Sequence, residues 1–372
     1  MVAGALTISS ADRAATACAS SSLRRHRTWR APAALLLSAL VLVSTARAAP
    51  AAPGEFFGVV PQAPPSAADF ERMRGVVGTV RVPVEWFRIQ PRPRTYDLSG
   101  LDAIVGEAAD VGIRILPFVY GSPRWLTGDP AHPPLGSDRA RRVWAELLHR
   151  LVRRYGPGGL FWQGRERPMP ILSWQVWNEP NYLLFWRPHP SPRGYAKLLK
   201  RSARAIRAID PDASILAAGV APVEAGISPW AFLRRMYRVP GVRHDFDIAA
   251  LHPYAPYVRW VIDQIRFVRA VMAEAGDGHK PLQLTEVGVA SDGAFPNPFD
   301  KGPIGQASFL RRTLRLSLVK RHRWRLAGID WFTWKDAAAA DPHCVFCQFG
   351  GLFDSAGSAK PAWWAFRRIA TQ

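Results

Sequence analysis

The chain of 372 residues alternates short apolar runs with longer amphipathic stretches from Phe56 onward. This alternation is typical of a parallel sheet whose strands are joined by helices. The strands are predicted at residues 56–60, 80–84, 113–119, 171–176, 215–220, 246–251, 282–285 and 329–333. The helices are predicted at 66–74, 101–109, 144–155, 191–209, 260–273, 307–319 and 361–369. Eight such units in about 320 residues predict an α/β fold, a single (β/α)8 TIM barrel.

An open, doubly wound sheet is the alternative, because it uses the same alternation of strands and helices. Such sheets usually carry a glycine-rich phosphate loop after the first strand. Here that position holds Val60-Pro61-Gln62-Ala63-Pro64, which contains no glycine. The closed barrel is therefore the favoured fold.

The first 48 residues have the layout of a secretory signal peptide. Four arginines precede an apolar run at residues 31–43, and Ala46-Arg47-Ala48 fits a small-x-small cleavage site. An uncleaved anchor is the alternative, although the run is short for a span of about 20 residues. We expect a signal peptide (1–48), a short Ala/Pro tether (49–54) and one barrel domain (55–372). The mature protein is expected to be secreted or associated with the cell envelope, without stable membrane insertion.

The formal net charge of +20 comes from 49 Lys and Arg against 29 Asp and Glu. Six arginines and one aspartate lie before Ala48, so the rest of the chain carries +15. The basic residues are scattered over predicted helix faces, which indicates a solvated basic surface. Attraction to an anionic glycan or cell envelope is the functional alternative. Nucleic-acid binding is not expected, because no motif supports it.

Cys344 and Cys347 are the two cysteines that follow the predicted signal peptide. An even count in an exported chain favours a disulfide, here a local one that braces a loop. A zinc site would need a second pair of ligands, and the sequence offers none. No metal and no cofactor is expected, and free thiols are the remaining alternative.

Two predicted strands end in a glutamate. Trp174-Gln175-Val176-Trp177-Asn178-Glu179-Pro180-Asn181 closes the fourth strand, and Leu284-Thr285-Glu286-Val287-Gly288 closes the seventh. The carboxyl ends of parallel strands meet at one rim of a barrel, where such barrels carry out chemistry. A retaining glycosidase needs one ionised and one protonated carboxyl about 5–5.5 Å apart. The sequence therefore predicts that Glu179 and Glu286 form a catalytic pair.

Other polar and aromatic side chains lie on or follow predicted strands and are candidates for the same rim: Arg81, Glu85, Tyr120, Trp125, Asn178, His252, Tyr254 and Trp334. A cation favours the charged form of a nearby carboxyl, so Arg81 would keep one glutamate ionised. The charge fixed in this way would raise the proton affinity of the other glutamate.

Each of these side chains also has a structural interpretation. Arg81 fits an ion pair at a strand end, and His252 fits a core histidine. Tyr254 and Trp334 fit core packing, and for Tyr120 and Trp125 packing is as well supported as sugar stacking. Glu85 is interpreted first as a helix-cap or salt-bridge residue. The tryptophans at helical spacing are predicted to be core residues: Trp144, Trp363 and Trp364.

The two glutamate motifs together resemble those of retaining (β/α)8 glycoside hydrolases of clan A, related to families 39 and 5. Arg81–Trp86, Gly121–Trp125, Leu251–Tyr254 and Gly351–Asp354 fit the same resemblance, which runs from about residue 55 to the end. Val289 and Ala290 depart from it, because relatives often carry a tryptophan and polar residues there. This departure concerns the shape of the subsites.

The resemblance implies a role for each matching residue. Glu179 is the expected acid/base and Glu286 the expected nucleophile. Asn178 is expected to hydrogen-bond the sugar 2-hydroxyl, Arg81 and Tyr254 to orient Glu286, and His252 to lie near the acid/base. Trp334 is expected to form the floor of the subsite that holds the reacting sugar.

The expected function is a secreted retaining glycoside hydrolase that cleaves O-glycosidic bonds of a polysaccharide or oligosaccharide by double displacement. A non-catalytic glycan-binding barrel and a transglycosylase using the same site are the alternatives. Nothing in the sequence specifies the sugar, the linkage, internal or terminal cleavage, or the oligomeric state.

Overall fold

The computed structural model describes residues 54–293, 297–339, 341, 344 and 346–372. The predicted signal peptide (1–48) and the tether up to residue 53 lie outside the described residues. Eight parallel strands form one sheet in the order β5-β4-β3-β2-β1-β8-β7-β6. Their bounds are β1 (Phe57–Val60), β2 (Thr79–Glu85), β3 (Arg114–Tyr120), β4 (Ser173–Val176), β5 (Ser214–Leu216), β6 (Ala249–Leu251), β7 (Leu282–Val287) and β8 (Leu326–Phe332).

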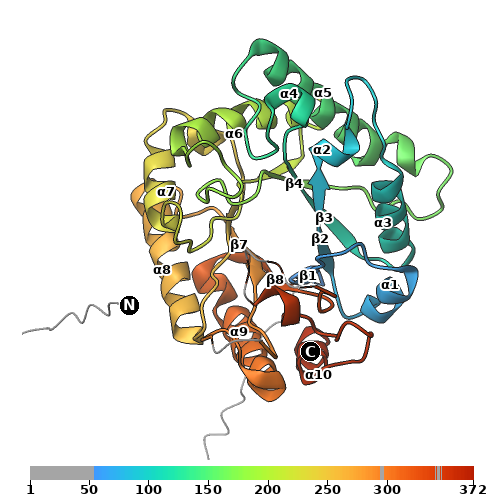
Figure 1. Cartoon of the computed structure of the whole chain (residues 1–372), viewed down its shortest axis with the longest axis vertical. Helices are drawn as coiled ribbons and strands as arrows, with labels where there is room; N and C mark the ends of the chain where they lie inside the picture. Colours follow the sequence, from blue (N-terminus) through green and yellow to red (C-terminus); the bar gives the residue numbers. More distant parts are fainter. Residues whose placement is uncertain (1–53, 294–296, 340, 342–343, 345) are drawn as a thin grey trace, which may run out of the picture. The chain divides into compact units, whose positions relative to one another are not determined.

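The sheet closes on itself. β1 pairs with both β2 and β8. On the opposite side, parallel bridges join Leu216 to Ile248 and Val220 to Leu251, and so connect the β5 and β6 regions. Figure 1 shows the helices arranged around this ring of strands. The prediction of a single (β/α)8 barrel is confirmed.

The helices follow the strands in the predicted order, and three of them begin at serine caps. The side chains of Ser66, Ser137 and Ser191 each accept a backbone N–H of the first turn that would otherwise lack a partner. The helix bounds are α1 (Ala67–Met73), α2 (Trp86–Ile89), α3 (Ser99–Asp110), α4 (Arg124–Thr127), α5 (Asp138–Tyr155), α6 (Pro192–Arg207), α7 (Pro229–Tyr237), α8 (Val258–Glu274), α9 (Gly302–Trp324) and α10 (Pro361–Ala370), with 3-10 turns η1 (Leu160–Trp162), η2 (Val242–His244) and η3 (Cys347–Phe349).

Helix α7 is the main element that the sequence prediction missed. It is only nine residues long, so its apolar pattern covers little more than two turns. Phe232, Leu233 and Met236 are buried on its inner side, and Pro229 stands in its first turn. Proline at a helix start and apolar residues three and four apart were the available signals.

The core lies inside the barrel and between the strands and the helices. Trp144 and Trp363 are buried as predicted, whereas Trp364 is 54% exposed, so the prediction that it is a core residue was wrong. In the part of the chain that the structure describes, no helix combines the length and apolar character needed to cross a membrane.

Several strand residues that point into the barrel are polar. Asp330 on β8 is buried and accepts a hydrogen bond from Gln283 at 3.1 Å. A Cβ on the facing Gly58 would lie 2.0 Å from the Asp330 carboxylate, so β1 needs a glycine there. The barrel interior is therefore partly polar.

Candidate active site

A cavity of about 900 Å³ opens at the carboxyl ends of the strands. The side chains of Glu85 and Tyr120, at the ends of β2 and β3, line one side of it. Asn178 and Glu179, just after β4, and Glu286 on β7 line it as well. We call this cavity the cleft. It brings together residues that are far apart in the sequence, as the barrel topology requires.

Glu179 and Glu286 face each other in the cleft, and each is only 7% exposed. The Nδ1 atom of His252 lies 2.7 Å from Glu179 Oε1 and 3.6 Å from Glu286 Oε2. One oxygen of each glutamate and the histidine nitrogen all lie within 4.8 Å of one another. Carboxyl groups of retaining glycosidases are about 5–5.5 Å apart, and those of inverting enzymes about 6.5–9.5 Å. The spacing therefore fits the retaining arrangement.

The guanidinium of Arg81 organises the Glu286 side of the cleft. It is fully buried and donates to Glu286 Oε1 at 2.6 Å, to Gln175 Oε1 at 2.7 Å and to Asn178 Oδ1 at 2.9 Å. The ring of Phe118 lies 3.8 Å from its central carbon. Each nitrogen of the guanidinium therefore donates a hydrogen bond and one face lies on a ring, which fixes its charge beside Glu286.

Tyr254 completes the surroundings of Glu286 by donating its hydroxyl proton to Oε2. Burial, and secondarily the charge of Glu286, raises the pKa of Tyr254 well above its ordinary value, so the phenol remains a donor. Both oxygens of Glu286 thus accept a hydrogen bond from a fixed donor. Hydrogen bonds to the charged form of a carboxyl stabilise that form.

The two glutamates have pKa shifts of opposite sign. Burial raises the pKa of Glu179 above its usual range, and the negative charge of Glu286 adds to the effect. Burial also acts on Glu286, but His252, Arg81 and the hydrogen bonds from Tyr254 and Arg81 outweigh it and lower its pKa. One carboxyl is therefore held protonated and the other ionised over a shared pH range.

The backbone that presents Glu179 adopts an uncommon conformation. Trp177 and Glu179 have positive φ values of 70° and 37°, which cost of order 1–3 kcal/mol each for residues with side chains. The N–H of Trp177 donates to Val119 O at 2.9 Å, and that of Glu179 donates to Gly219 O at 3.1 Å. These bonds hold the turn after β4, so the Glu179 carboxyl points into the cleft.

Gly219 has a second role beside Glu179. A Cβ at this position would lie 2.0 Å from His252 Nε2. The imidazole is buried, so it has no room to move away from such a Cβ. The absence of a side chain lets His252 approach Glu179. Sequence inspection did not single out Gly219, since its contact lies on a different strand.

Gln175 is another site residue that the sequence prediction missed. It is fully buried on β4, and its Oε1 accepts a hydrogen bond from the Nε–H of Arg81. A polar residue between Trp174 and Val176 in an otherwise apolar strand was the available signal. It marks a position where the barrel interior needs a hydrogen-bond acceptor.

The structure contradicts two predicted substrate contacts. Trp334 is 2% exposed, packs on Phe353 and Trp363, and lines a separate cavity beside Pro61–Pro65. Its predicted place as the floor of the cleft was wrong, and Phe332 at the end of β8 lines the cleft instead. Trp125 also lies outside the cleft, because its Nε1 is bonded to Gln90 O and its ring faces a cavity on the barrel flank.

Tyr120 lines the cleft, and its hydroxyl donates to Glu85 Oε1 at 3.0 Å. Glu85 also pairs with Arg88 at 2.6 Å, as its salt-bridge interpretation predicted, but its side chain does not cap α2. Cys344 and Cys347 form a disulfide at the edge of the cleft. The predicted local disulfide is present in the structure.

Among the described residues, Glu179, His252 and Glu286 form the cluster that could hold a divalent cation, because two carboxylates and an imidazole are suitable ligands. The positive charge of Arg81, 2.6 Å from Glu286 Oε1, would compete with such an ion. Both Glu286 oxygens already accept hydrogen bonds. The arrangement fits acid/base chemistry better than metal binding.

No family model and no curated protein matches the sequence. Among solved structures, a family 39 glycoside hydrolase from Bacteroides cellulosilyticus WH2 has a TM-score of 0.64 and 22% identity, covering 86% of this chain and 64% of that enzyme. The chain therefore spans a little under two thirds of that enzyme's length.

A monomeric β-xylosidase from Caulobacter crescentus CB15 has a TM-score of 0.61 and 18% identity, covering 84% of this chain and 68% of the xylosidase. A family 5, subfamily 18 enzyme from Bifidobacterium longum, in complex with Manβ1-4GlcNAc, has a TM-score of 0.65 and 18% identity, covering 85% and 78%. At these identities the likeness shows the fold. The chain shares the (β/α)8 architecture of glycoside hydrolases of families 39 and 5.

Proposed function

We propose that this protein is a retaining glycoside hydrolase with Glu179 as acid/base and Glu286 as nucleophile. The observation that carries the proposal is the pair of buried carboxyls in one cleft, within 4.8 Å of each other and with opposite pKa shifts. The (β/α)8 likeness to family 39 and family 5 hydrolases supports it. Burying two carboxyls together is not expected in a barrel without a function for them, since burying a charge costs free energy.

In the first step, an oxygen of ionised Glu286 attacks the anomeric carbon of the sugar. The bond from that carbon to the leaving oxygen breaks, and Glu179 gives its proton to this oxygen. The products are a free alcohol and a glycosyl ester on Glu286. Arg81 and Tyr254 hold Glu286 in place and in its charged form before the attack.

In the second step, water attacks the anomeric carbon and releases Glu286. Because esterification removes the negative charge of Glu286, the pKa of Glu179 falls, and Glu179 can accept the proton of the attacking water. His252, at 2.7 Å from Glu179, orients its carboxyl in both steps. Asn178 uses its oxygen to accept from Arg81, which leaves its N–H groups for the sugar 2-hydroxyl.

The lining of the cleft indicates an uncharged or amino sugar as the substrate. Among the described residues it contains the carboxyl groups of Glu85, Glu179, Glu224, Glu286 and Asp341, and one guanidinium. That guanidinium belongs to Arg88, which is paired with Glu85, and the guanidinium of Arg81 beside the lining is paired with Glu286. With Glu179 protonated, the carboxylates still exceed these guanidinium groups by two. An acidic sugar would meet a repulsive potential here. The alternative of an anionic glycan as the cleaved substrate is therefore disfavoured.

Aromatic rings supply the apolar part of the cleft. The side chains that contribute them are Phe118, Tyr120, Tyr182, Phe185, Tyr254, Phe299, Phe332 and Phe346. Such rings pack against the C–H faces of sugars while the polar groups set orientation. A pyranoside without a carboxyl group fits this combination of rings and carboxylates.

We also propose that the enzyme acts outside the cytoplasm, secreted or attached to the cell envelope. The layout of residues 1–48 supports this, and so does the disulfide, since disulfides persist mainly in oxidising compartments. The mass of the exported protein should correspond to a chain beginning at Ala49. A mass that includes residues 1–48 would favour the uncleaved anchor.

The direct test is activity on a panel of nitrophenyl glycosides and oligosaccharides, with paired substitutions. Glu286→Ala should lose turnover by at least about 10⁴-fold, and azide should restore it with a product of inverted configuration. Glu179→Ala should be most impaired on substrates with poor leaving groups, by about 10²–10⁴-fold.

Two other outcomes would replace this proposal. Saturable sugar binding without product from any substrate would indicate a non-catalytic barrel. Products longer than the substrate, without released monosaccharide, would indicate a transglycosylase that uses the same covalent intermediate. Wild-type rates in both glutamate variants would remove the assigned roles.

A further inference from the structure

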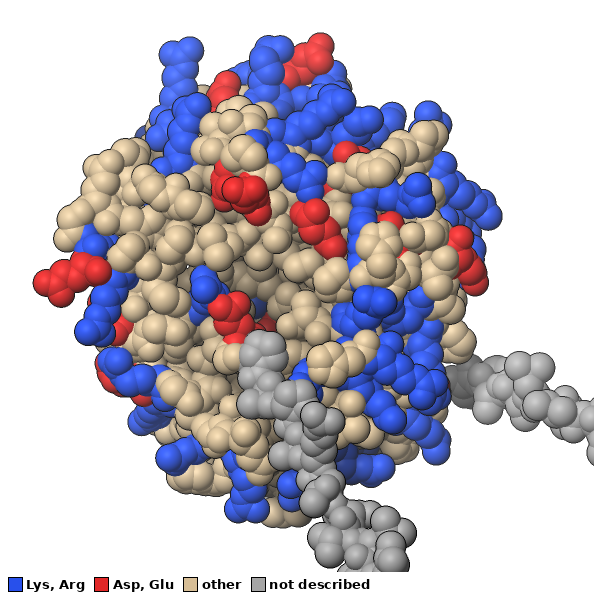
Figure 2. Space-filling view, turned by 180° about the vertical axis from the view of Figure 1, so that it is seen from behind, with Lys and Arg blue, Asp and Glu red and all other residues tan. Residues whose placement is uncertain are grey.

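A second large cavity, of about 770 Å³, lies on the outside of the barrel between α5 and the segment that joins β2 to α3. Its lining contains six arginines and one carboxylate, Glu146. The arginines are Arg94, Arg139, Arg142, Arg150, Arg153 and Arg154. We call this cavity the arginine groove. Figure 2 shows Lys and Arg gathered along the top of the molecule, where α5 and α6 lie.

Most of these guanidinium groups have no carboxylate partner. Arg154 pairs with Asp102 at 2.6 Å. Arg94, Arg142 and Arg153 form no ion pair with any described residue, although Glu146 lies one helical turn from Arg142. The groove therefore concentrates uncompensated positive charge against a concave wall, where the field is focused.

The arginines of α5 form a line. Arg139, Arg142, Arg150 and Arg153 are separated by three, eight and three residues, which places them on one face of the helix. At 1.5 Å per residue the line is about 21 Å long. This length exceeds a single small anion and suits an extended chain that carries charges at intervals.

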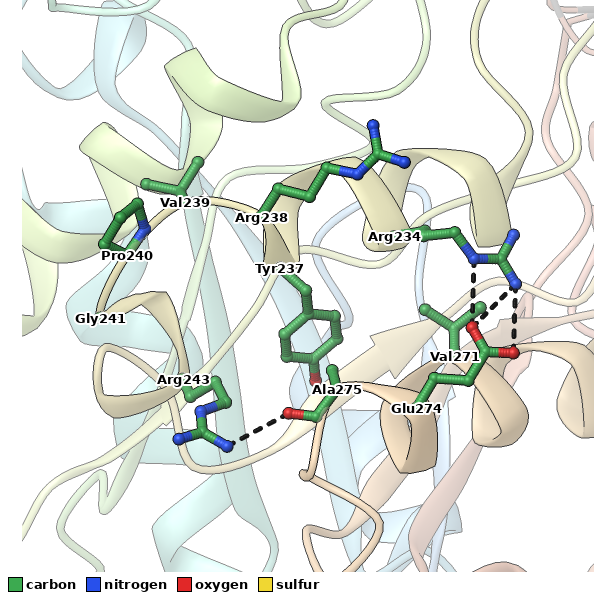
Figure 3. Close-up of a pocket in the computed structure, with 10 residues that line it drawn as sticks. All are labelled: Arg234, Tyr237, Arg238, Val239, Pro240, Gly241, Arg243, Val271, Glu274 and Ala275. Carbon is green, nitrogen blue, oxygen red and sulfur yellow. Dashed lines mark hydrogen bonds and ion pairs between the residues drawn. The ribbon is translucent and has the colours of Figure 1, made fainter.

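Two other cavities of this protein are also lined by basic side chains, and one of them, lined by Arg141, Lys197, Lys200, Arg201 and Arg204, has no carboxylate in its lining. The cavity of about 390 Å³ in Figure 3, between α7 and α8, is lined by Arg234, Arg238 and Arg243. There Arg234 forms a fork with Glu274, and Arg243 donates to Ala275 O at 3.2 Å. Glu274 neutralises Arg234 there, whereas the backbone carbonyl bonded to Arg243 leaves its charge in place, so this cavity offers two uncompensated guanidinium groups and the arginine groove offers more.

Two aromatic rings hold arginines in place in the groove. The Arg150 guanidinium lies 4.2 Å from the ring centre of Tyr96, and that of Arg139 lies 5.6 Å from that of Trp125. Trp125 is itself fixed by its bond to Gln90 O at 2.9 Å. Cation–π contact orients a guanidinium without neutralising it. Single-stranded nucleic-acid sites instead offer aromatic faces for bases to stack on, and here guanidinium groups already lie against these rings.

The groove and the cleft share one rim of the barrel. Arg88 lines the cleft and Gln90, two residues later, lines the groove. Trp125 follows the end of β3, whose last residue, Tyr120, lines the cleft. A polymer held in the groove would therefore lie beside the mouth of the cleft.

We propose that the arginine groove is an accessory binding site for an acidic polysaccharide that carries carboxylate or sulfate groups along its chain. The acidic cleft and the basic groove then bind different sugars: the groove holds the anionic polymer, and the cleft receives an uncharged or amino sugar. Binding in the groove does not depend on cleavage in the cleft. Its test can therefore succeed or fail independently of the proposed hydrolysis.

The experiment is calorimetric titration of the purified protein with four polymers: polygalacturonate, dextran sulfate, neutral dextran and single-stranded DNA. It compares the wild type with the triple variant Arg142→Gln, Arg150→Gln, Arg153→Gln. The matched control is Arg311→Gln, Arg312→Gln, Arg315→Gln, which removes the same charge from exposed positions on α9. Thermal unfolding of each variant reports whether it is folded.

We expect at least one of the two acidic polysaccharides to bind the wild type, and neutral dextran not to bind. The groove variant should weaken that binding at least tenfold and reduce the slope of log K against log salt by about two, as expected for lost phosphate-like contacts. The α9 variant should change affinity less than twofold. Comparison of the affinities for polygalacturonate and for dextran sulfate identifies carboxylate or sulfate as the preferred group.

Four results would overturn the proposal. Equal losses in the groove and α9 variants would show diffuse attraction to a basic surface. Unchanged binding in the groove variant, or no binding of either acidic polysaccharide to the wild type, would exclude the site. DNA bound more tightly than both acidic polysaccharides, and lost in the groove variant, would make it a nucleic-acid site.

Discussion

The two sides of the cleft bury a glutamate to the same extent and give it opposite protonation. Around Glu286 the structure places a guanidinium and a phenol, both donors to the charged form. Around the Glu179 carboxyl it places His252, which is shared with Glu286, and no lysine or arginine of the described residues is bonded to it. Burial alone would raise both pKa values, so the difference arises from the partners. The comparison shows that the partners of Glu286, which are His252, Tyr254 and the one arginine Arg81, assign the two roles.

Removal of that arginine should have the largest effect. Arg81→Met leaves Glu286 without its ion pair, so its pKa should rise and the acidic limb of the pH–rate profile should move to higher pH. Activity at neutral pH should fall about 10²-fold or more, and breaking a buried pair should cost about 3–5 kcal/mol of stability.

Arg81→Lys is the matched control for this change. It keeps the positive charge but loses the fork to Gln175 and Asn178. The acidic limb should stay closer to its wild-type position, although activity falls. If the acidic limb of Arg81→Met stayed where it is in the wild type, Arg81 would not set the charge of Glu286.

Gly219→Ala disturbs the other side of the cleft. The new Cβ would displace His252, which lies 2.0 Å from it, and with it the Glu179 carboxyl. A displacement of about 1 Å of a catalytic group costs about 10²-fold, so kcat should fall by about 10–100-fold with a smaller change in KM. Gly100→Ala on α3, where the new Cβ meets no atom within 4 Å, should leave kcat unchanged. Equal kcat values for both variants would contradict the role of Gly219.

Phe332 and Trp334 allow a test of which aromatic side chain at the end of β8 contacts the sugar. Phe332→Ala removes a ring from the cleft and should raise KM about tenfold, since an aromatic contact is worth about 0.5–1.5 kcal/mol beyond its buried area. Trp334→Phe should leave KM unchanged and lower the melting temperature, because Trp334 packs on Phe353 and Trp363. The opposite pattern would restore Trp334 as the sugar-contacting residue.

Asp330 should have the smallest effect on activity. Burial raises its pKa to about 7 from the ordinary 3.8. Its contribution to stability is therefore present below pH 3.8 and is lost as the pH rises through about 7. Asp330→Asn should be more stable than the wild type at pH 8, by up to roughly 4 kcal/mol, and show no gain at pH 4. Melting temperatures at the two pH values check this sign, and a gain at pH 4 alone would contradict it.

The sequence was sufficient for the barrel and for the two glutamates. Strands and helices alternate with distinct periods, and a glutamate that ends an apolar strand has few structural uses. His252 and Tyr254 follow the same rule, because both come just after the end of β6, whereas Arg81 lies within β2 and reaches Glu286 from there. These predictions depended on local pattern together with the topology of a parallel barrel.

The residues that the sequence analysis missed or misplaced depend on contacts between segments that are distant in the sequence. The chain leaves β8 after Phe332, so the alternation of side chains stops there and Trp334 turns into the core. Gly219 matters only through a ring on another strand, which no local pattern records. Trp125 follows a strand, as site residues do, but its indole N–H donates to the Gln90 carbonyl, and the ring therefore lies outside the cleft. Three-dimensional packing decided each of these cases.

The most direct test of the central claim is a carbon NMR titration of the glutamate carboxyls in the wild type and in Glu286→Gln. We predict that Glu286 titrates below the usual range and Glu179 above it, and that Glu286→Gln lowers the pKa of Glu179 by removing a neighbouring negative charge. If both carboxyls titrated together near the usual value, or if Glu179 were unaffected by the substitution, the assignment of acid and nucleophile to this pair would be contradicted.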